Sequence, residues 1–135
     1  MRLRVVSSKD EIQNLNPHEQ MIHMAFRASN TDYLSLLQKC PRLRLIQLPR
    51  SYHKTMSNAI RMFLDVQGIE MLSGDLCGHR KDLDEYFIVD EAIMEEIIAL
   101  ADSGTSLEDI ANQVPKTARL GSDLIKYIVK NKISV

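Results

Sequence analysis

Short apolar runs alternate with helix-length segments through the first half of the chain. The runs combine alternation of apolar and polar positions with β-branched and aliphatic residues, which is typical of β-strands. They predict four strands, at residues 2–8, 20–26, 42–48 and 69–75. Because the intervening segments are long enough for helical crossovers, we expect the strands to pair in parallel with right-handed connections.

Helix signals fill the three gaps between these strands. Ser8 and Glu11 form a capping box for a short first helix. A second helix is predicted within 29–40, with Asn30 or Thr31 as its cap. Ser51 is predicted to cap a longer third helix that ends at Gly68. The apolar positions expected to face inward on this third helix are Met56, Ala59, Ile60, Phe63 and Leu64.

These elements predict a small open α/β domain over residues 1–88. It would contain a parallel sheet of four to five strands with helices on both faces. The stretch YFIVD at 86–90 is the candidate for the fifth strand. After it the pattern predicts three helices, at 91–104, 105–114 and 122–132. They would form a compact C-terminal three-helix unit over residues 89–135.

Composition and charge narrow the class of protein. With 135 residues and 44% hydrophobic content, the chain can bury one core and a small appendage. A net charge of -1 and a pI of about 6.4 argue against a uniformly basic nucleic-acid coat but allow a local basic patch. The two cysteines, Cys40 and Cys77, are too few for a disulfide scaffold. No signal peptide or membrane-spanning run is visible, so we expect a cytoplasmic protein with no membrane partner.

Part of the first half resembles a known fold family. The sequence CPRLRLIQLP at 40–49, followed by GIEML at 68–72, is similar to part of the flavodoxin-like substrate domain of D-2-hydroxyacid dehydrogenases. The resemblance implies a flavodoxin-like sheet. The G-x-G-x-x-G motif of the dinucleotide-binding domain in those enzymes is absent, so the resemblance implies no dehydrogenase activity and no cofactor.

Nearly the whole chain resembles an archaeal family of uncharacterised proteins found in methanogens. The resemblance is carried by LNPHEQMIHMAFRASN at 15–30, IQLPRSYHKTMSNAIRMFL at 46–64, GHRKDLDEYFIV at 78–89 and the helical tail. It implies an archaeal, cytoplasmic protein and assigns no functional residue.

Polar residues cluster where the predicted parallel strands end. Ligands of open parallel sheets bind outside the carboxyl ends of the strands, where loops and helix N-termini converge. Each predicted turn at this edge carries a cation, a hydroxyl group or both, which suits a phosphate or a carboxylate. The predicted anion-binding residues are Arg27, Ser29, Arg50, Ser51, His53, Lys54, His79 and Arg80. In the alternative, structural interpretation, Asn30 and Ser51 only cap helices, and Arg50 pairs with Asp75 or Asp82.

Cys77 and His79 suggest a second kind of site, a metal or thiol centre. With His53 they could complete an open zinc site, but the chain has no C-x-x-C or H-x-x-x-H pair. Residues two apart on a loop rarely aim at each other, so no metal site and no catalytic residue is assigned. An enzyme acting on a phosphorylated or carboxylated metabolite is the alternative function. Its base or nucleophile would have to be His53, His79, Cys77 or Asp75.

The tail carries a separate signal, because DSGTSLEDIANQVP at 102–115 resembles the first half of a helix-turn-helix. Residues 90–109 hold seven acidic residues and no Lys or Arg, whereas cations dominate 115–135, a charge pattern typical of a groove-reading unit. The predicted DNA-binding or partner-binding residues are Lys116, Arg119, Lys126 and Lys130. The turn VPKTARLGS is longer than usual, and the first turn of the last helix lacks an Arg, Asn or Gln to contact a base edge. A packing or protein-interaction role therefore stays open.

Together these observations favour a non-enzymatic regulatory or interaction protein. Its α/β rim would sense a small anion, and its helical tail would bind DNA or a protein partner. Self-association into a homo-oligomer is left open by the sequence.

Overall fold

The computed structural model describes residues 1–74, 85–113, 120 and 122–131, and within them five strands form one sheet in the order β4-β3-β2-β1-β5. The strands are β1 (Arg2–Val6), β2 (Met21–Met24), β3 (Leu45–Leu48), β4 (Glu70–Ser73) and β5 (Tyr86–Ile88). Strands β1 to β4 pair in parallel, and β5 pairs antiparallel with β1. The predicted small open sheet, its parallel character and its fifth strand are confirmed.

The strand order differs from that of a flavodoxin-like fold. Flavodoxin-like sheets have the order 2-1-3-4-5, in which the direction of winding reverses beside the first strand. Here the four parallel strands follow one another in sequence order, so no reversal occurs among them. The topology therefore does not support the flavodoxin-like part of the sequence prediction.

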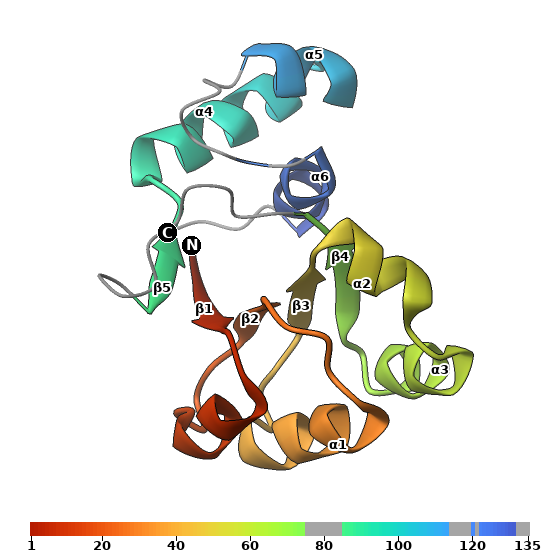
Figure 1. Cartoon of the computed structure of the whole chain (residues 1–135). Coiled ribbons are helices and arrows are strands. Elements are labelled where there is room, and N and C mark those ends of the chain that lie inside the picture. The colour runs from red at the N-terminus through yellow and green to blue at the C-terminus, as the bar shows by residue number, and fades with distance from the viewer. Residues whose placement is uncertain (75–84, 114–119, 121, 132–135) are drawn as a thin grey trace.

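The crossover connections cover one face of the sheet (Figure 1). Parallel strands that are added in one direction, with right-handed connections, place their crossovers on the same face. The connecting elements are the 3-10 helix η1 (Lys9–Asn14) and the helices α1 (Asn30–Lys39), α2 (Arg50–Thr55) and α3 (Asn58–Val66). The core on this face includes Val6, Ile22, Met24, Leu36, Ile46, Leu48, Ile60 and Leu64.

The C-terminal helices cover the opposite face. These helices are α4 (Glu91–Asp102), α5 (Leu107–Gln113) and α6 (Ser122–Asn131), which lie above the sheet in Figure 1. Their inward side chains share one buried cluster with the strands, which includes Leu3, Val5, Met21, Leu45, Leu72, Met94, Ile97, Ile110, Ile125 and Ile128. Helices on both faces are therefore confirmed. The tail supplies the second helical layer, and the parts before and after residue 88 bury one common core.

Two helix starts differ from the sequence prediction. The cap of α1 is Ser29, not Asn30 or Thr31, because the Ser29 hydroxyl accepts the N–H of Asp32 at 3.2 Å. The Asp32 carboxylate accepts the Ser29 N–H in return, at 2.9 Å, which completes a capping box.

The predicted long third helix is two helices. Ser51 does not cap it, because α2 already begins at Arg50, with Pro49 as its N-cap. The chain then becomes extended at Met56 and Ser57, and the Ser57 hydroxyl caps α3 by accepting the N–H of Ile60 at 3.2 Å. Of the five positions expected to face inward, Ile60 and Leu64 are buried and Met56 packs against the core, whereas Ala59 and Phe63 are exposed.

A shared core predicts that the tail and the sheet unfold together. Ile128 on α6 is fully buried between them, so Ile128→Ala should lower the free energy of unfolding by about 2–5 kcal/mol. Urea denaturation followed by far-UV circular dichroism should show one cooperative transition both for the unmodified protein and for Ile128→Ala. Ile88→Ala is the matched control, because Ile88 is 61% exposed and the same truncation there should cost little. An early transition confined to the tail, with the remainder unchanged, would contradict the common core.

Candidate functional site

The carboxyl ends of β3 and β4 open onto a cavity of about 500 Å³. The cavity lies between α2, the end of β4 and the beginning of α6, so it is bounded by both the α/β part and the tail. Its described lining residues are Arg50, His53, Lys54, Ser73, Gly74, Ser122 and Asp123. Three of these are basic side chains, and one is acidic.

Helix α2 positions the three basic side chains. The carbonyl of Pro49 accepts the N–H groups of Tyr52 and His53, each at 3.0 Å, which starts the helix directly after β3. Arg50 and Lys54 are four residues apart and therefore lie on one face of the helix, where both are exposed. His53 lies beside them and is half-buried. The sequence correctly grouped these three residues at the end of β3.

Helix α6 runs along β4 and is held at both of its ends. The Asp123 carboxylate accepts the backbone N–H of Ser73 at 3.2 Å, beside the end of β4. Lys130 donates to Glu70 Oε1 at 2.8 Å, at the beginning of β4, and this hydrogen bond raises the pKa of Lys130. Helix and strand therefore run in opposite directions, which brings the N-terminus of α6 to the cavity.

The wall formed by Gly74 requires a residue without a side chain. A Cβ at this position would lie 2.6 Å from Gln47 Nε2, well inside van der Waals contact. Gln47 has little room to move, because it is buried and its Oε1 is 2.8 Å from His23 Nδ1. Gly74 thus lets the chain leave β4 directly over a buried polar pair.

The surroundings of the His53 ring lower its pKa. Burial lowers the pKa of His53, the positive charge of Arg61 lowers it further, and Asp123 raises it. The Arg61 guanidinium also donates to the backbone carbonyl of His53, which joins α3 to α2. At neutral pH the positive charge of the cavity therefore comes from Arg50 and Lys54.

The structure does not bring all of the predicted anion-binding residues together. Arg27 lines a separate cavity of about 190 Å³, where its Nη1 donates to Thr55 Oγ1 at 2.7 Å and its guanidinium carbon lies 5.1 Å from the centroid of the Tyr52 ring. Ser29 caps α1, and Ser51 is an exposed residue inside α2. Arg27 and Ser29 therefore have structural partners of their own, away from Arg50.

Several other predicted residues lie outside the described part of the chain. They are Asp75, Cys77, His79, Arg80, Lys116 and Arg119. Of the four residues that could serve an enzyme as base or nucleophile, His53 is therefore the one whose position is described. Within the described ranges, no three His, Cys, Asp or Glu side chains are grouped so that they could hold a metal ion.

Two residues of the cavity, Ser122 and Asp123, were not predicted to belong to it. They come from the tail, and helical spacing alone does not indicate which end of a helix lies against a sheet. Ser73 and Gly74 were placed at the end of the fourth strand but were not named as binding residues. The docking of α6 along β4 is what adds the tail to the site.

One face of α6 remains open to solvent. Ser122, Lys126 and Lys130 are exposed and follow one another at four-residue intervals, so they form a row about 12 Å long. The side chains buried on the rest of the helix are Leu124, Ile125, Tyr127 and Ile128. A groove of about 380 Å³ separates this row from α5, and Ser122 and Lys126 line it on the α6 side.

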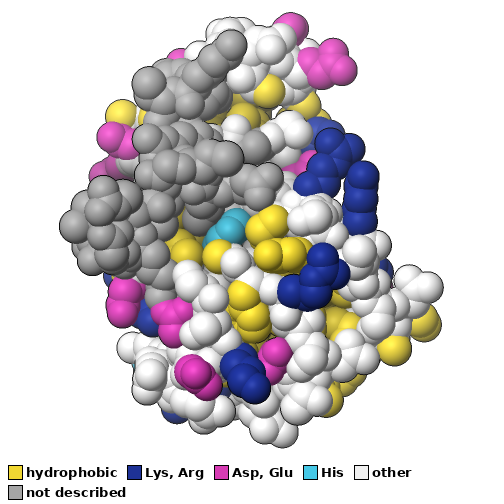
Figure 2. All heavy atoms as spheres, viewed as in Figure 1, with side chains coloured by type: hydrophobic (Ala, Val, Ile, Leu, Met, Phe, Trp, Pro, Cys, Tyr) yellow, Lys and Arg dark blue, Asp and Glu magenta, His cyan; other side chains and the backbone are white. Residues whose placement is uncertain are grey.

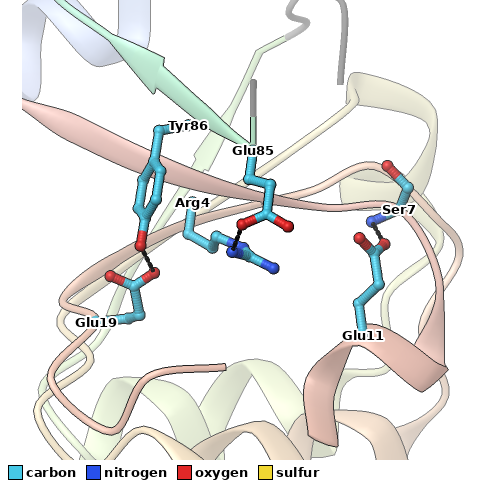
Figure 3. Close-up of polar contacts among 6 residues, drawn as sticks. All are labelled: Arg4, Ser7, Glu11, Glu19, Glu85 and Tyr86. Carbon is cyan, nitrogen blue, oxygen red and sulfur yellow. Dashed lines mark hydrogen bonds and ion pairs between the residues drawn. The ribbon is translucent and has the colours of Figure 1, made fainter. Parts of the chain in front are cut away.

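A second polar cluster joins β5 to β1 (Figure 3). Buried Arg4 contacts Glu85 Oε2 through its Nη1 at 2.5 Å, and the Tyr86 hydroxyl donates to buried Glu19 at 3.0 Å. Burial and this hydrogen bond raise the pKa of Tyr86. Arg2 lies 4.4 Å from the centroid of the Tyr86 ring. Arg4 pairs with Glu85 on β5's side and Tyr86 with Glu19, so the cluster fastens the antiparallel strand, while the buried Arg4 Nε has no hydrogen-bond partner among the described residues.

Two family models match the chain. Residues 2–85 match the N-terminal domain of the DUF1699 family, a family of unknown function, and residues 92–130 match the C-terminal HTH domain of DUF1699. Searches of curated proteins and of solved structures gave no match. Within the described residues, no helix has the length and apolar character needed to cross a bilayer. The first match alone covers more than half of the sequence, and the chain therefore belongs to the DUF1699 family.

Proposed function

We propose that the protein is a non-enzymatic DNA-binding regulator that contacts the duplex with the exposed row of α6. The observation that carries this function is the orientation of α6: its apolar sides are buried, and Ser122, Lys126 and Lys130 face solvent. The helix belongs to the part of the chain that matches an HTH domain, in which the last helix of the motif enters the major groove.

The chemistry of the row favours contact with the DNA backbone over recognition of sequence. Lysine and serine side chains bind phosphate oxygens, which fixes the position of a protein on the duplex without reading bases. Bidentate recognition of guanine or adenine uses Arg, Asn or Gln at the start of the helix. In the described first turn of α6, Ser122 and Asp123 precede two buried apolar residues, so we expect strong salt dependence and modest sequence preference.

Lys126→Ala should weaken binding to an unspecific duplex. Each neutralised phosphate changes the salt dependence of log K by about 0.9, so the slope against log salt should fall by about 1. The loss corresponds to roughly eightfold in affinity at about 0.1 M monovalent salt, if the contact contributes little at about 1 M. Fluorescence anisotropy of a labelled duplex across a salt series measures both quantities.

Lys9→Ala is the matched control, because Lys9 is exposed on η1, which covers the other face of the sheet. It removes the same charge and should leave the slope unchanged. If the unmodified protein shows no binding at low salt, DNA binding is excluded and the tail becomes a packing or protein-interaction module.

The cavity beside α2 supports a second part of the proposed function, the binding of one phosphate or carboxylate group. Arg50 and Lys54 provide two positive charges from one helix face, and Ser122 adds a hydroxyl group. Guanidinium groups form charge-assisted hydrogen bonds with such anions. Asp123 lowers the net positive charge of the cavity, although its carboxylate already accepts the N–H of Ser73.

Low-millimolar sulfate should raise the melting temperature of the protein, because a ligand that binds only the folded state stabilises it. Arg50→Ala should abolish this increase, whereas Arg42→Ala, an exposed arginine before β3, should retain it. Burial holds the pKa of His53 below its ordinary value, so the ring gains its charge as the pH falls, and the increase should grow below about pH 6.5. His53→Gln should remove this growth. An unchanged sulfate effect in Arg50→Ala would show that the cavity does not bind the anion.

A further inference from the structure

The C-terminal helices supply few positive charges for contact with a duplex. Residues 91–113, which contain α4 and α5, include six Asp or Glu and no Lys or Arg. On α6 the exposed cations are Lys126 and Lys130, and Lys130 is paired with Glu70 on the sheet. Between half and two-thirds of protein–DNA hydrogen bonds go to phosphates and sugars, and these contacts fix the orientation of the protein. Within the described residues the row of α6 is short, so cations from a neighbouring element would extend its contact with phosphates.

Helix α2 brings such cations to the beginning of α6. Arg50 and Lys54 are exposed and line the same cavity as Ser122. Ser122 also lines the groove between α5 and α6, together with Lys126. The basic face of α2 therefore continues the exposed row of α6 past its N-terminal end. Figure 2 shows Lys and Arg side chains on the side of the molecule where α2 and α6 lie.

The acidic residue of the cavity does not oppose this surface strongly. Asp123 is half-buried, and its Oδ2 accepts the N–H of Ser73. Its side chain is thereby directed toward the end of β4. Of the other residues that line the cavity within the described part of the chain, none is acidic.

We propose that α2 is part of the DNA-binding surface and that Arg50 and Lys54 hold a backbone phosphate beside the first turn of α6. They can do so only if α6 contacts DNA as proposed above. The DNA surface would then span both matched domains of the family, with the HTH part providing the groove-facing helix and the α/β part providing the flanking phosphate contact. The group recognised is a phosphate, which DNA or a free anion could supply, and the two sources can be separated by experiment.

The test uses the full chain and a labelled unspecific duplex, with fluorescence anisotropy over a salt series. Arg50→Ala/Lys54→Ala should lower the slope of log K against log salt by about 1, because the proposed contact neutralises one backbone phosphate. The matched control is Lys39→Ala/Arg42→Ala, which removes one lysine and one arginine just before β3, at the opposite end of that strand. It changes the net charge equally and should leave the slope as in the unmodified protein. Melting temperatures establish that both variants are folded.

The possible outcomes separate this role of α2 from the DNA-binding function itself. A smaller slope in the α2 variant, with an unchanged control, supports a composite surface. If Lys126→Ala weakens binding but the α2 variant does not, the tail binds DNA alone and the role of α2 is wrong. If the α2 variant loses stabilisation by inorganic phosphate and still binds DNA with full salt dependence, the cavity is a free-anion site and the role of α2 is equally overturned. If the unmodified protein does not bind the duplex, both the proposed DNA-binding function and the proposed role of α2 are wrong.

Discussion

The sheet face opposite the crossover helices is apolar and has to be shielded from water. Leu3, Val5, Met21 and Leu45 on this face are each less than 10% exposed, although the crossover helices that the structure describes lie on the other side. Burial of apolar surface contributes about 25 cal/mol per Å², so an uncovered sheet face of this size would leave a small domain without adequate stability. The helices α4, α5 and α6 supply the cover. Their packing against the strands is the constraint from which the positions of the cavity and of the exposed α6 row follow.

Once α6 is packed on this face, its polar contacts fix its direction and register. Asp123 lies at the end of β4 and Lys130 at its beginning, so the helix has one orientation relative to the strand. An exposed ion pair such as Lys130–Glu70 contributes little stability, and its value here is that it specifies the register. The Asp123 contact also occupies the N–H of Ser73 on β4, which is the outer strand of the sheet at that end. An edge strand left open is a site for unwanted pairing, so α6 also protects the sheet.

The sequence predicts the elements of this fold better than their arrangement. Strands were found from short-range alternation, and the basic group at Arg50, His53 and Lys54 was found because it follows a strand. Strand order depends on pairing between distant segments, so local similarity to a flavodoxin-like domain did not indicate the order that occurs. A hydroxyl residue after a strand favours a cap at Ser51, but Pro49 starts one helix before it and Ser57 caps a second helix after it. Ser122 and Asp123 joined the cavity through tertiary packing, which spacing along the chain does not encode.

A net charge of -1 need not prevent binding to a polyanion when the charges are segregated. In this fold α4 and α5 pack above the sheet, whereas Arg50 and Lys54 of α2 line one cavity with the N-terminal residues of α6, and Lys126 lines the adjacent groove. Phosphate contacts act over short distances at physiological ionic strength, because the screening length is about 8 Å. The nearest charges therefore determine the contact, and Glu108, which lines the groove with Lys126, limits how far the surface can extend toward α5. Segregation of this kind would restrict a duplex to the side of the molecule that carries α2 and α6. The contacts of Asp123 and Lys130 with β4 would then set the angle at which α6 meets the duplex.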